Sequence, residues 1–387
     1  MNKPAIRFAG FTDAWEQRKA KELCSIGTGK SNTQDQVDDG KYPFYIRSDI
    51  PVKSNKYLYD CEAVITIGDG NIGKVFHYVN GKFDLHQRCY KMTDFQDIWG
   101  KYFFYYFSTK FYDRAMKMTA KATVDSVRLE MISEMDIKKP PQISEQKQIA
   151  EFFTSLDNLI TLHQREYAKL VNIKASMLEK MFPKDGSAYP EVRFAGFTDA
   201  WEQRKLGDVA KEVTRNDPYS DAPVMMITAN NGFIEQSERY AFNNAGESLK
   251  KYILLQKGEL AYNHGASKLR PYGSCFALTT AENARIPFVY HCFSAEGINP
   301  EFLSIELNGD EIEGQLRRIV SSGARMDGLL NISFDEYTSV SVLLPKKEEQ
   351  DHIADFFRQL DNLITLHQRK LEKLQNIKKS MLEKMFV

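Results

Sequence analysis

The sequence lacks the features that mark secreted, membrane-spanning and disulfide-bonded proteins. It contains no run of about eighteen apolar residues, and its first residues, MNKPAIRFAGF, include no apolar stretch of the signal-peptide kind. The five cysteines are an odd number, form no CxxC pair and have no metal-ligand spacing. We therefore expect reduced thiols in a soluble, cytoplasmic protein with no membrane contact.

A net charge is also absent, since 52 basic residues balance 52 acidic ones. This balance excludes a protein that holds polyanions by bulk charge alone, but it leaves room for local basic patches that grip phosphates.

Several catalytic motifs are missing, among them the Walker A string, GxSxG and HExxH. The string NDPYS (Asn216–Ser220) has one proline and follows no hydrophobic strand, so it predicts a turn rather than the tetrapeptide of an adenine methyltransferase. GDGNIG (Gly68–Gly73) matches G-x-G-x-x-G, but a strand-like segment follows it where a dinucleotide site needs a helix. A hairpin or bulge is the better interpretation.

A nuclease-like set of Asp136, Glu145 and Lys147 also occurs, yet the corresponding second copy has Asp351 in place of the lysine. We therefore interpret Glu145 as an acidic residue at a helix start, where the helix dipole favours it. The sequence predicts no catalytic, cofactor-binding or metal-binding residue in this chain.

What the chain does contain is a repeat. The thirteen-residue tag RFAGFTDAWEQRK occupies residues 7–19 and again 193–205. Glu145–Phe182 recurs as Glu349–Phe386, with 28 of 38 positions identical. The segments between tag and repeat differ, and a proline- and glycine-containing linker (183–192) joins the halves. Two equivalent ends with dissimilar middles predict two similar scaffold surfaces that carry two different binding domains. Within the tag, the spacing of Asp13 and Glu16 resembles a capping box; structural and partner-binding roles for the tag both stay open.

The repeated segment has the heptad pattern of a coiled coil and contains no glycine or proline. The predicted seam and partner-docking residues are Phe153, Leu156, Ile160, His163 and Leu170, with Phe357, Leu360, Ile364, His367 and Leu374 in the second copy. A further apolar row beside the seam indicates a third helical neighbour. For the two histidines an interface contact is favoured over a metal or pH-sensing role.

The two middle segments read as mixed α/β domains, with strands at 62–70, 73–79 and 337–345 and an aromatic helix at 97–117. Both carry basic, polar loops suited to DNA, because Arg and Lys pair with guanine edges and phosphates while Asn pairs with adenine. The candidate DNA-binding residues are Lys74, His77, Asn80, Lys82, Arg88, Lys121 and Arg128 in the first segment, and Asn263, His264, Lys268, Arg270 and Arg325 in the second.

The layout resembles the specificity subunit of Type I restriction–modification systems, and the resemblance spans essentially the whole chain. It rests on WEQRKLGDVA (Trp201–Ala210), on LLPKKEEQDHIADFFRQLDNLI (Leu343–Ile364), and on the counterpart KKPPQISEQKQIAEFFTSLDNLI (Lys138–Ile160). The first half departs from the pattern, with WEQRKAKEL where the family has a leucine–glycine pair.

The resemblance implies an α+β fold: two mixed α/β target-recognition domains joined by two long helices that pack as an antiparallel coiled coil, with an internal pseudo-two-fold repeat. The expected domains are 1–144 (first target-recognition domain), 145–182 (central spacer helix), 183–192 (linker), 193–348 (second target-recognition domain) and 349–387 (C-terminal spacer helix).

The resemblance also implies a function without catalysis. Each target-recognition domain would read one half of a bipartite double-stranded DNA site, and the helices would fix the gap and dock two DNA adenine methyltransferase subunits. Restriction and translocase subunits would join through them. S-adenosylmethionine, ATP and magnesium are then expected only in the partner subunits. The alternative is a coiled-coil adaptor whose middle domains bind proteins rather than DNA.

Overall fold

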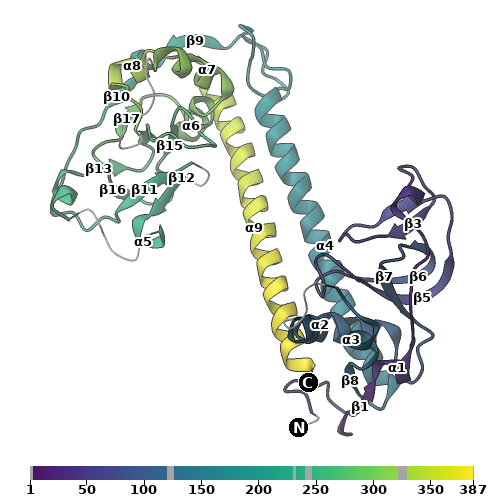
Figure 1. Cartoon of the computed structure of the whole chain (residues 1–387). Helices are drawn as coiled ribbons and strands as arrows, with labels where there is room; N and C mark the ends of the chain where they lie inside the picture. The colour runs from purple at the N-terminus through teal and green to yellow at the C-terminus, as the bar shows by residue number, and fades with distance from the viewer. Residues whose placement is uncertain (1–2, 120–125, 230–231, 240–245, 321–328, 387) are drawn as a thin grey trace. The chain divides into compact units, whose positions relative to one another are not determined.

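The computed structural model describes residues 3–119, 126–229, 232–239, 246–320 and 329–386. The chain separates into two compact units (Figure 1). Unit 1 comprises residues 1–166 together with 367–387, and unit 2 comprises residues 167–366. Because both boundaries fall inside the two long helices, each unit contains the first part of one helix and the last part of the other.

Unit 1 is built on a six-stranded sheet with the order β2-β7-β5-β6-β3-β4. Every pairing is antiparallel except β3 with β6. Its strands and helices are β1 (Glu16–Lys19), α1 (Ala20–Leu23), β2 (Ser25–Thr28), β3 (Tyr42–Tyr45), β4 (Val52–Ser54), β5 (Tyr59–Ile67), β6 (Phe76–Leu85), β7 (Cys89–Thr93), α2 (Gly100–Thr119), α3 (Leu129–Ser133) and β8 (Asp136–Lys139). A short 3-10 turn, η1, covers Thr33–Asp35. The predicted strands at 62–70 and 73–79 form the β5–β6 hairpin, and the glycine-rich string connects them.

The aromatic helix α2 supplies much of the core of unit 1. Tyr102, Phe103, Phe107 and Phe111 are fully buried, and Phe107 stacks on Phe111 with ring centroids 4.5 Å apart. Phe103, Phe107 and Phe111 recur at the four-residue spacing that places side chains on one face of a helix. This aromatic face therefore forms part of the core of unit 1.

Unit 2 contains a four-stranded antiparallel sheet, β10-β17-β14-β15, and three two-stranded pairs. Its elements are β9 (Glu202–Lys205), β10 (Ala210–Glu212), β11 (Met225–Thr228), β12 (Gly232–Glu235), α5 (Gln236–Arg239), β13 (Ile253–Gln256), β14 (Leu260–Asn263), β15 (Ser274–Ala277), β16 (Asn283–Ile286), β17 (His291–Ala295), α6 (Pro300–Leu307), α7 (Asp310–Ile319), α8 (Phe334–Thr338) and β18 (Ser341–Leu344), with 3-10 turns η2 (Leu206–Asp208) and η3 (Gly246–Lys251).

The predicted strand at 337–345 is shorter than expected, because its first residues belong to α8. Ser333 and Glu336 form a capping box: the Ser333 hydroxyl accepts from the Glu336 amide at 3.2 Å, and the Glu336 carboxylate accepts from the Ser333 amide at 2.7 Å. This cap starts a helix ahead of β18.

The two long helices are α4 (Ile143–Lys180) and α9 (Lys347–Met385), and each begins two residues before the predicted start. Within unit 1, Phe153 of α4 stacks on Phe386 beyond the end of α9, with ring centroids 5.6 Å apart. Further along α4, Asp157 pairs with Lys378 at 2.5 Å. Later residues of α4 thus contact earlier residues of α9, so the two helices pack antiparallel, as predicted.

Unit 2 repeats these contacts at the equivalent positions. Phe357 of α9 meets Phe182 beyond the end of α4 at 6.2 Å, and Asp361 pairs with Lys174 at 2.5 Å. Among the described residues, none of the helices combines the length and the hydropathy that a membrane span requires.

Candidate DNA-reading and partner-docking surfaces

The repeated tag and the repeated helix start are joined in each unit by a buried ion pair. The Arg7 guanidinium donates through Nε and Nη2 to the two Glu145 carboxylate oxygens at 2.7 and 2.8 Å. The Glu145 side chain is fully buried, and its carboxylate raises the pKa of Arg7. Arg193 and Glu349 repeat the pair at 2.7 Å for both hydrogen bonds. Glu145 lies in the first turn of its helix as expected, but sequence reasoning missed its partner.

The glutamine that follows each of these glutamates attaches the unit's own domain. The Gln146 carbonyl accepts from the Trp99 amide at 2.8 Å, and its amide donates to the Pro140 carbonyl at 2.9 Å. Gln350 accepts from the Asn299 amide and donates to the Pro345 carbonyl, both at 2.8 Å. The glutamine at the start of each long helix, together with the proline that precedes the helix, therefore connects the helix to its domain.

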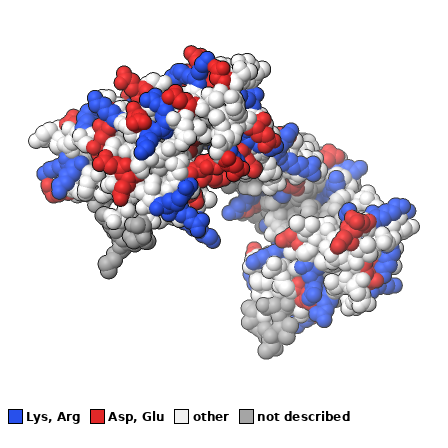
Figure 2. Space-filling view, turned by 90° about the horizontal axis from the view of Figure 1, so that it is seen from above, with Lys and Arg blue, Asp and Glu red and all other residues white. Residues whose placement is uncertain are grey.

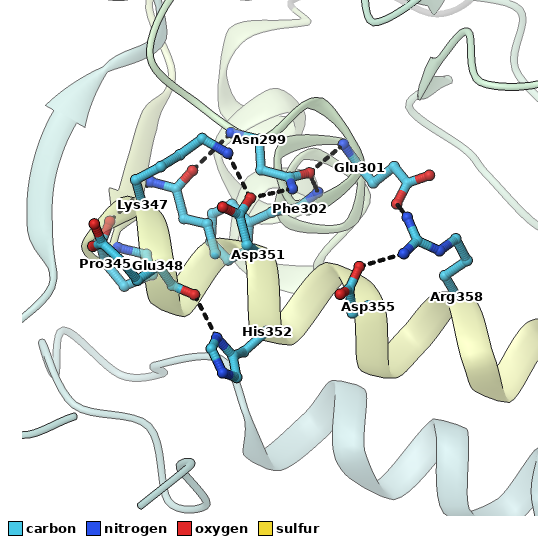
Figure 3. A network of polar contacts seen from close by, with 11 residues as sticks. Asn299, Glu301, Phe302, Pro345, Lys347, Glu348, Asp351, His352, Asp355 and Arg358 are labelled. Carbon is cyan, nitrogen blue, oxygen red and sulfur yellow. Dashed lines mark hydrogen bonds and ion pairs between the residues drawn. The ribbon is translucent and has the colours of Figure 1, made fainter. Parts of the chain in front are cut away.

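Figure 3 shows the unit 2 junction at the start of α9. The Asn299 side chain caps α6 by accepting from the amides of Glu301 and Phe302 at 2.9 and 3.1 Å. The same side chain donates to the Asp351 carboxylate at 2.6 Å, and Arg358 reaches Glu301 at 3.0 Å. Polar contacts from three turns of α9 thus hold the start of α6 against α9.

The rest of the tag is structural as well. Glu16–Lys19 pairs antiparallel with β8, and Glu202–Lys205 pairs with β18. The capping-box interpretation of Asp13 and Glu16 is wrong, because Glu16 begins a strand and the Asp13 carboxylate accepts from Gln142 at 2.9 Å. Trp15 and Trp201 are almost completely buried. These contacts explain the repeat: the tag covers the start of a repeated helix.

The predicted seam residues face the helix–helix contact. Phe153, Leu156, Phe357 and Leu360 are buried. The others are partly buried: Ile160, His163, Leu170, Ile364, His367 and Leu374.

The two seam histidines touch, with the Nδ1 atoms of His163 and His367 3.0 Å apart. One ring must donate and the other accept, and burial lowers the pKa of His163. The contact fits the predicted histidine interface. In the described part of the chain no three His, Cys, Asp or Glu side chains are grouped to hold a metal ion.

The helices leave an apolar row in solvent, in equivalent places in the two units. Leu159 and Leu162 are 44% and 51% exposed in unit 1, and Leu363 and Leu366 are 43% and 45% exposed in unit 2. Each unit therefore presents an equivalent exposed apolar patch on its helix, which is a candidate docking surface.

The described DNA-binding candidates of unit 1 are mostly exposed. Lys74, Asn80, Lys82, Arg88 and Arg128 lie at the surface. Lys74 and Lys82 lie over tyrosine rings at 5.4 and 4.6 Å, and Arg128 is 3.4 Å from a glutamate. Lys121 lies outside the described residues.

His77 of the same unit is partly buried and serves a structural contact. Its Nε2 lies 3.1 Å from the Ser48 carbonyl oxygen, and burial lowers the pKa of the ring. The neutral ring can donate this hydrogen bond, which ties the loop after β3 to β6.

The unit 2 candidates are largely turned inward. His264 is 7% exposed, with Nδ1 2.8 Å from the Leu330 carbonyl and Nε2 2.8 Å from the Val289 carbonyl. Asn263 donates to a backbone carbonyl at 3.2 Å and accepts from an amide at 2.9 Å, while Arg270 donates to a carbonyl at 2.7 Å. All three side chains therefore form hydrogen bonds within unit 2. Lys268 is exposed, and Arg325 lies outside the described residues.

Sequence reasoning missed one charged cluster in unit 1. The Asp69 carboxylate accepts from Arg88 Nη1 at 2.8 Å and from Arg47 Nη1 at 3.1 and 3.2 Å. Although burial opposes the charge, the two arginines lower the pKa of Asp69. The three residues come from separate loops, at the ends of β3 and β5 and before β7. No spacing in the sequence links Arg47 to the other two.

The visible face in Figure 2 has basic and acidic side chains interspersed, without one large field of either sign. Any nucleic-acid contact on this face therefore depends on local clusters, which agrees with the neutral overall charge.

The five cysteines are all free, and four of them are buried. Burial raises the pKa of the Cys24, Cys89 and Cys275 thiols to about 12, so they stay protonated and inert.

Comparisons with known proteins agree with this architecture. Residues 12–172 match the family model for the Type I restriction modification DNA specificity domain. The chain is 24% identical to the Type I restriction enzyme MjaVIII specificity subunit of Methanocaldococcus jannaschii, over 95% of this chain and 91% of that one. It is 26% identical to the HindI specificity subunit of Haemophilus influenzae, over 48% of this chain and 41% of the relative.

Among solved structures, the S subunit of a Type I restriction-modification system from M. genitalium has the same fold. The TM-score is 0.64 at 13% identity, over 100% of this chain and 99% of that chain. Fold and matched domain define a protein with a Type I DNA specificity domain on a duplicated helical scaffold. In sequence and in fold the chain is therefore similar to the specificity subunits of Type I restriction–modification systems, as its sequence resemblance predicted.

Proposed function

We propose that each unit reads one half of a bipartite double-stranded DNA site and that the chain itself catalyses no reaction. The observation that carries this proposal is the repeated junction. Arg7 with Glu145 and Arg193 with Glu349 mount two dissimilar domains on equivalent helix starts. One scaffold that holds two different domains in the same way suits a target with two different parts.

The repeated helix surface supports the second part of the proposal. Leu159 and Leu162, and their counterparts Leu363 and Leu366, give two equivalent apolar patches. Each patch docks one copy of a DNA adenine methyltransferase subunit, and restriction and translocase subunits join through these copies. S-adenosylmethionine, ATP and magnesium belong to the partners, where the base is flipped and methylated. The length of the paired helices sets the gap between half-sites.

DNA contact in this proposal falls to the exposed cations. Lys74, Arg88, Arg128 and Lys268 are exposed among the described candidates, and Arg47 joins them in unit 1. Phosphate contacts position the domains, and base contacts give the sequence preference.

The test is methylation sequencing of DNA from a methylation-free host that carries this chain with its cognate methyltransferase subunit. The methyltransferase subunit alone is the control. We expect a new methylated-adenine motif in two parts with a fixed gap. If the complex assembles and no motif appears, the adaptor alternative replaces the proposal.

A further inference from the structure

The cluster of Arg47, Asp69 and Arg88 carries an inference about the DNA sequence that unit 1 reads. We propose that Arg47 and Arg88, held by Asp69, read two G·C base pairs no more than two base steps apart. This inference rests on the proposed function, because it requires unit 1 to read one half-site.

Each guanidinium in the cluster keeps one edge available. Both arginines contact Asp69 through Nη1 alone. Within the described part of the chain, neither Nε nor Nη2 of either arginine forms a hydrogen bond or an ion pair. These two nitrogens form the fork that pairs bidentately with O6 and N7 of guanine, the commonest specific contact in the major groove. The side chains are 47% and 62% exposed, so the forks can reach a ligand.

The short distance between the two guanidinium groups limits the spacing of the bases that they can contact. Arg47 Nη1 and Arg88 Nη1 lie 3.2 and 2.8 Å from the same Asp69 oxygen, Oδ2, so they are at most about 6 Å apart. Successive base pairs rise about 3.4 Å along the helix axis. The two guanidinium groups therefore fit neighbouring base pairs, or base pairs separated by one other.

The cluster is rigidly mounted, as base readout requires. The Gly68 amide donates to the Arg88 carbonyl at 2.8 Å, and the Val127 amide donates to the Gly68 carbonyl at 2.7 Å. A Cβ at Gly68 would lie 2.6 Å from the Arg88 carbonyl oxygen, so the two backbones approach as closely as only glycine permits. On the other side, His77 holds the loop of Arg47 through the Ser48 carbonyl.

The carboxylate favours a base over a phosphate as the ligand. The Asp69 side chain is 20% exposed. Although burial opposes its charge, the two arginines lower the pKa of Asp69 and so keep the carboxylate ionised. A phosphate beside it would be repelled, whereas the guanine edge offers neutral acceptors. A carboxylate that orients arginines also reduces the rotamer freedom lost on binding.

The experiment uses the complex of this chain with its cognate methyltransferase subunit. Its site is first found by methylation sequencing, and its affinity is then measured on duplexes with single base-pair changes at several salt concentrations. The variants are Arg88→Ala, Arg47→Ala and Asp69→Asn, with Arg18→Ala, an exposed arginine of the tag, as control. Arg88→Lys keeps the charge but lacks the fork.

We expect one half-site with two G·C pairs within three consecutive positions. Arg88→Ala should reduce discrimination at one of them by about tenfold to a hundredfold and leave the other half-site unaffected. Arg47→Ala should act at the second pair, Asp69→Asn should weaken both, and Arg88→Lys should lose discrimination while binding persists.

Two results overturn the inference while the proposed function stands. One is a bipartite motif in which neither half has such G·C pairs. The other is a uniform loss of affinity on all sequences with a shallower salt dependence, the signature of phosphate contacts. Absence of any bipartite motif overturns the proposed function, and the inference with it.

Discussion

Replacing Arg7 with alanine tests whether the buried ion pair holds the tag to the helix in unit 1. The Glu145 carboxylate would lose both of its charge-assisted hydrogen bonds from Arg7, of 2.7 and 2.8 Å, while its side chain stays fully buried. Removing one partner of a buried pair leaves an uncompensated charge and costs about 3–5 kcal/mol. We expect Arg7→Ala to lower the free energy of opening β1 and the start of α4 by that amount.

Amide hydrogen exchange read by mass spectrometry measures this opening segment by segment, so it needs no two-state unfolding of the whole chain. Arg193→Ala should have the same effect on unit 2 and spare unit 1. Arg18→Ala, in the same tag but 55% exposed, should change the free energy by no more than about 0.5 kcal/mol. Replacing Arg7 and Glu145 together by apolar residues should cost less than Arg7→Ala alone. A loss below about 1 kcal/mol in Arg7→Ala would refute the buried-charge reasoning.

Three further predictions follow from single features of the units. Burial raises the pKa of Glu306 to about 7 from 4.5, so the folded state keeps a proton that the unfolded state has lost, and stability falls as pH rises between these values. Glu306→Gln should therefore stabilise unit 2 by roughly 3 kcal/mol at pH 8 but not at pH 4.5, measured by denaturant unfolding; equal effects at both pH values would contradict the shift. Leu162→Lys and Leu366→Lys, at half-exposed positions, should each leave folding intact and remove one bound methyltransferase copy, so native mass spectrometry should find one copy per chain instead of two. A circular permutant should keep its melting temperature within a few degrees. In this permutant a copy of Pro183–Glu191 connects the last residue to the first, and the new termini lie within the original Pro183–Glu191. Failure to fold would show that the two ends of the helix pair are not equivalent.

The permutant rests on a pair of equivalent contacts. The Val192 amide donates to the Lys180 carbonyl at 2.9 Å in unit 2, where the linker connects the two segments. The Ile6 amide donates to the Lys384 carbonyl at 3.1 Å at the equivalent position of unit 1.

The sequence predicted the elements whose pattern is periodic. The heptads gave both long helices, and the antiparallel packing follows the family resemblance. The aromatic helix was recognised because its core face repeats every three to four residues. The sequence did not predict that each compact unit includes the last part of the other repeat's long helix. A heptad pattern shows which residues form a seam, but it does not show which helix packs against them. Nor did the sequence separate α8 from β18, since the cap at Ser333 is a local signal inside a strand-like composition.

The candidate DNA-reading residues were harder to predict, because residue type does not tell which way a loop side chain points. His264 and Arg88 are both polar residues of basic loops, yet His264 lies between two backbone carbonyls inside unit 2 while Arg88 is 62% exposed. Arg47 follows β3 and Asp69 follows β5, and the two residues meet although β6 lies between these strands in the sheet. Contacts of this kind have no fixed spacing along the chain.

The way in which the domains are attached explains how one chain can carry two dissimilar ones. Gln146 and Gln350 hold their domains through backbone groups: the amides of Trp99 and Asn299, and a proline carbonyl in each unit. Nearly every residue type offers the same amide, so this contact places little demand on the domain's sequence. The buried arginine–glutamate pair, which requires particular side chains, lies within the repeated tag and helix. In unit 2, the contacts of Asp351 with Asn299 and of Arg358 with Glu301 add side chains of the domain itself. Replacing one domain, from the end of the tag strand to the proline before the repeated helix, should therefore change the DNA half-site that is read. The buried arginine–glutamate pair should not be weakened by this exchange.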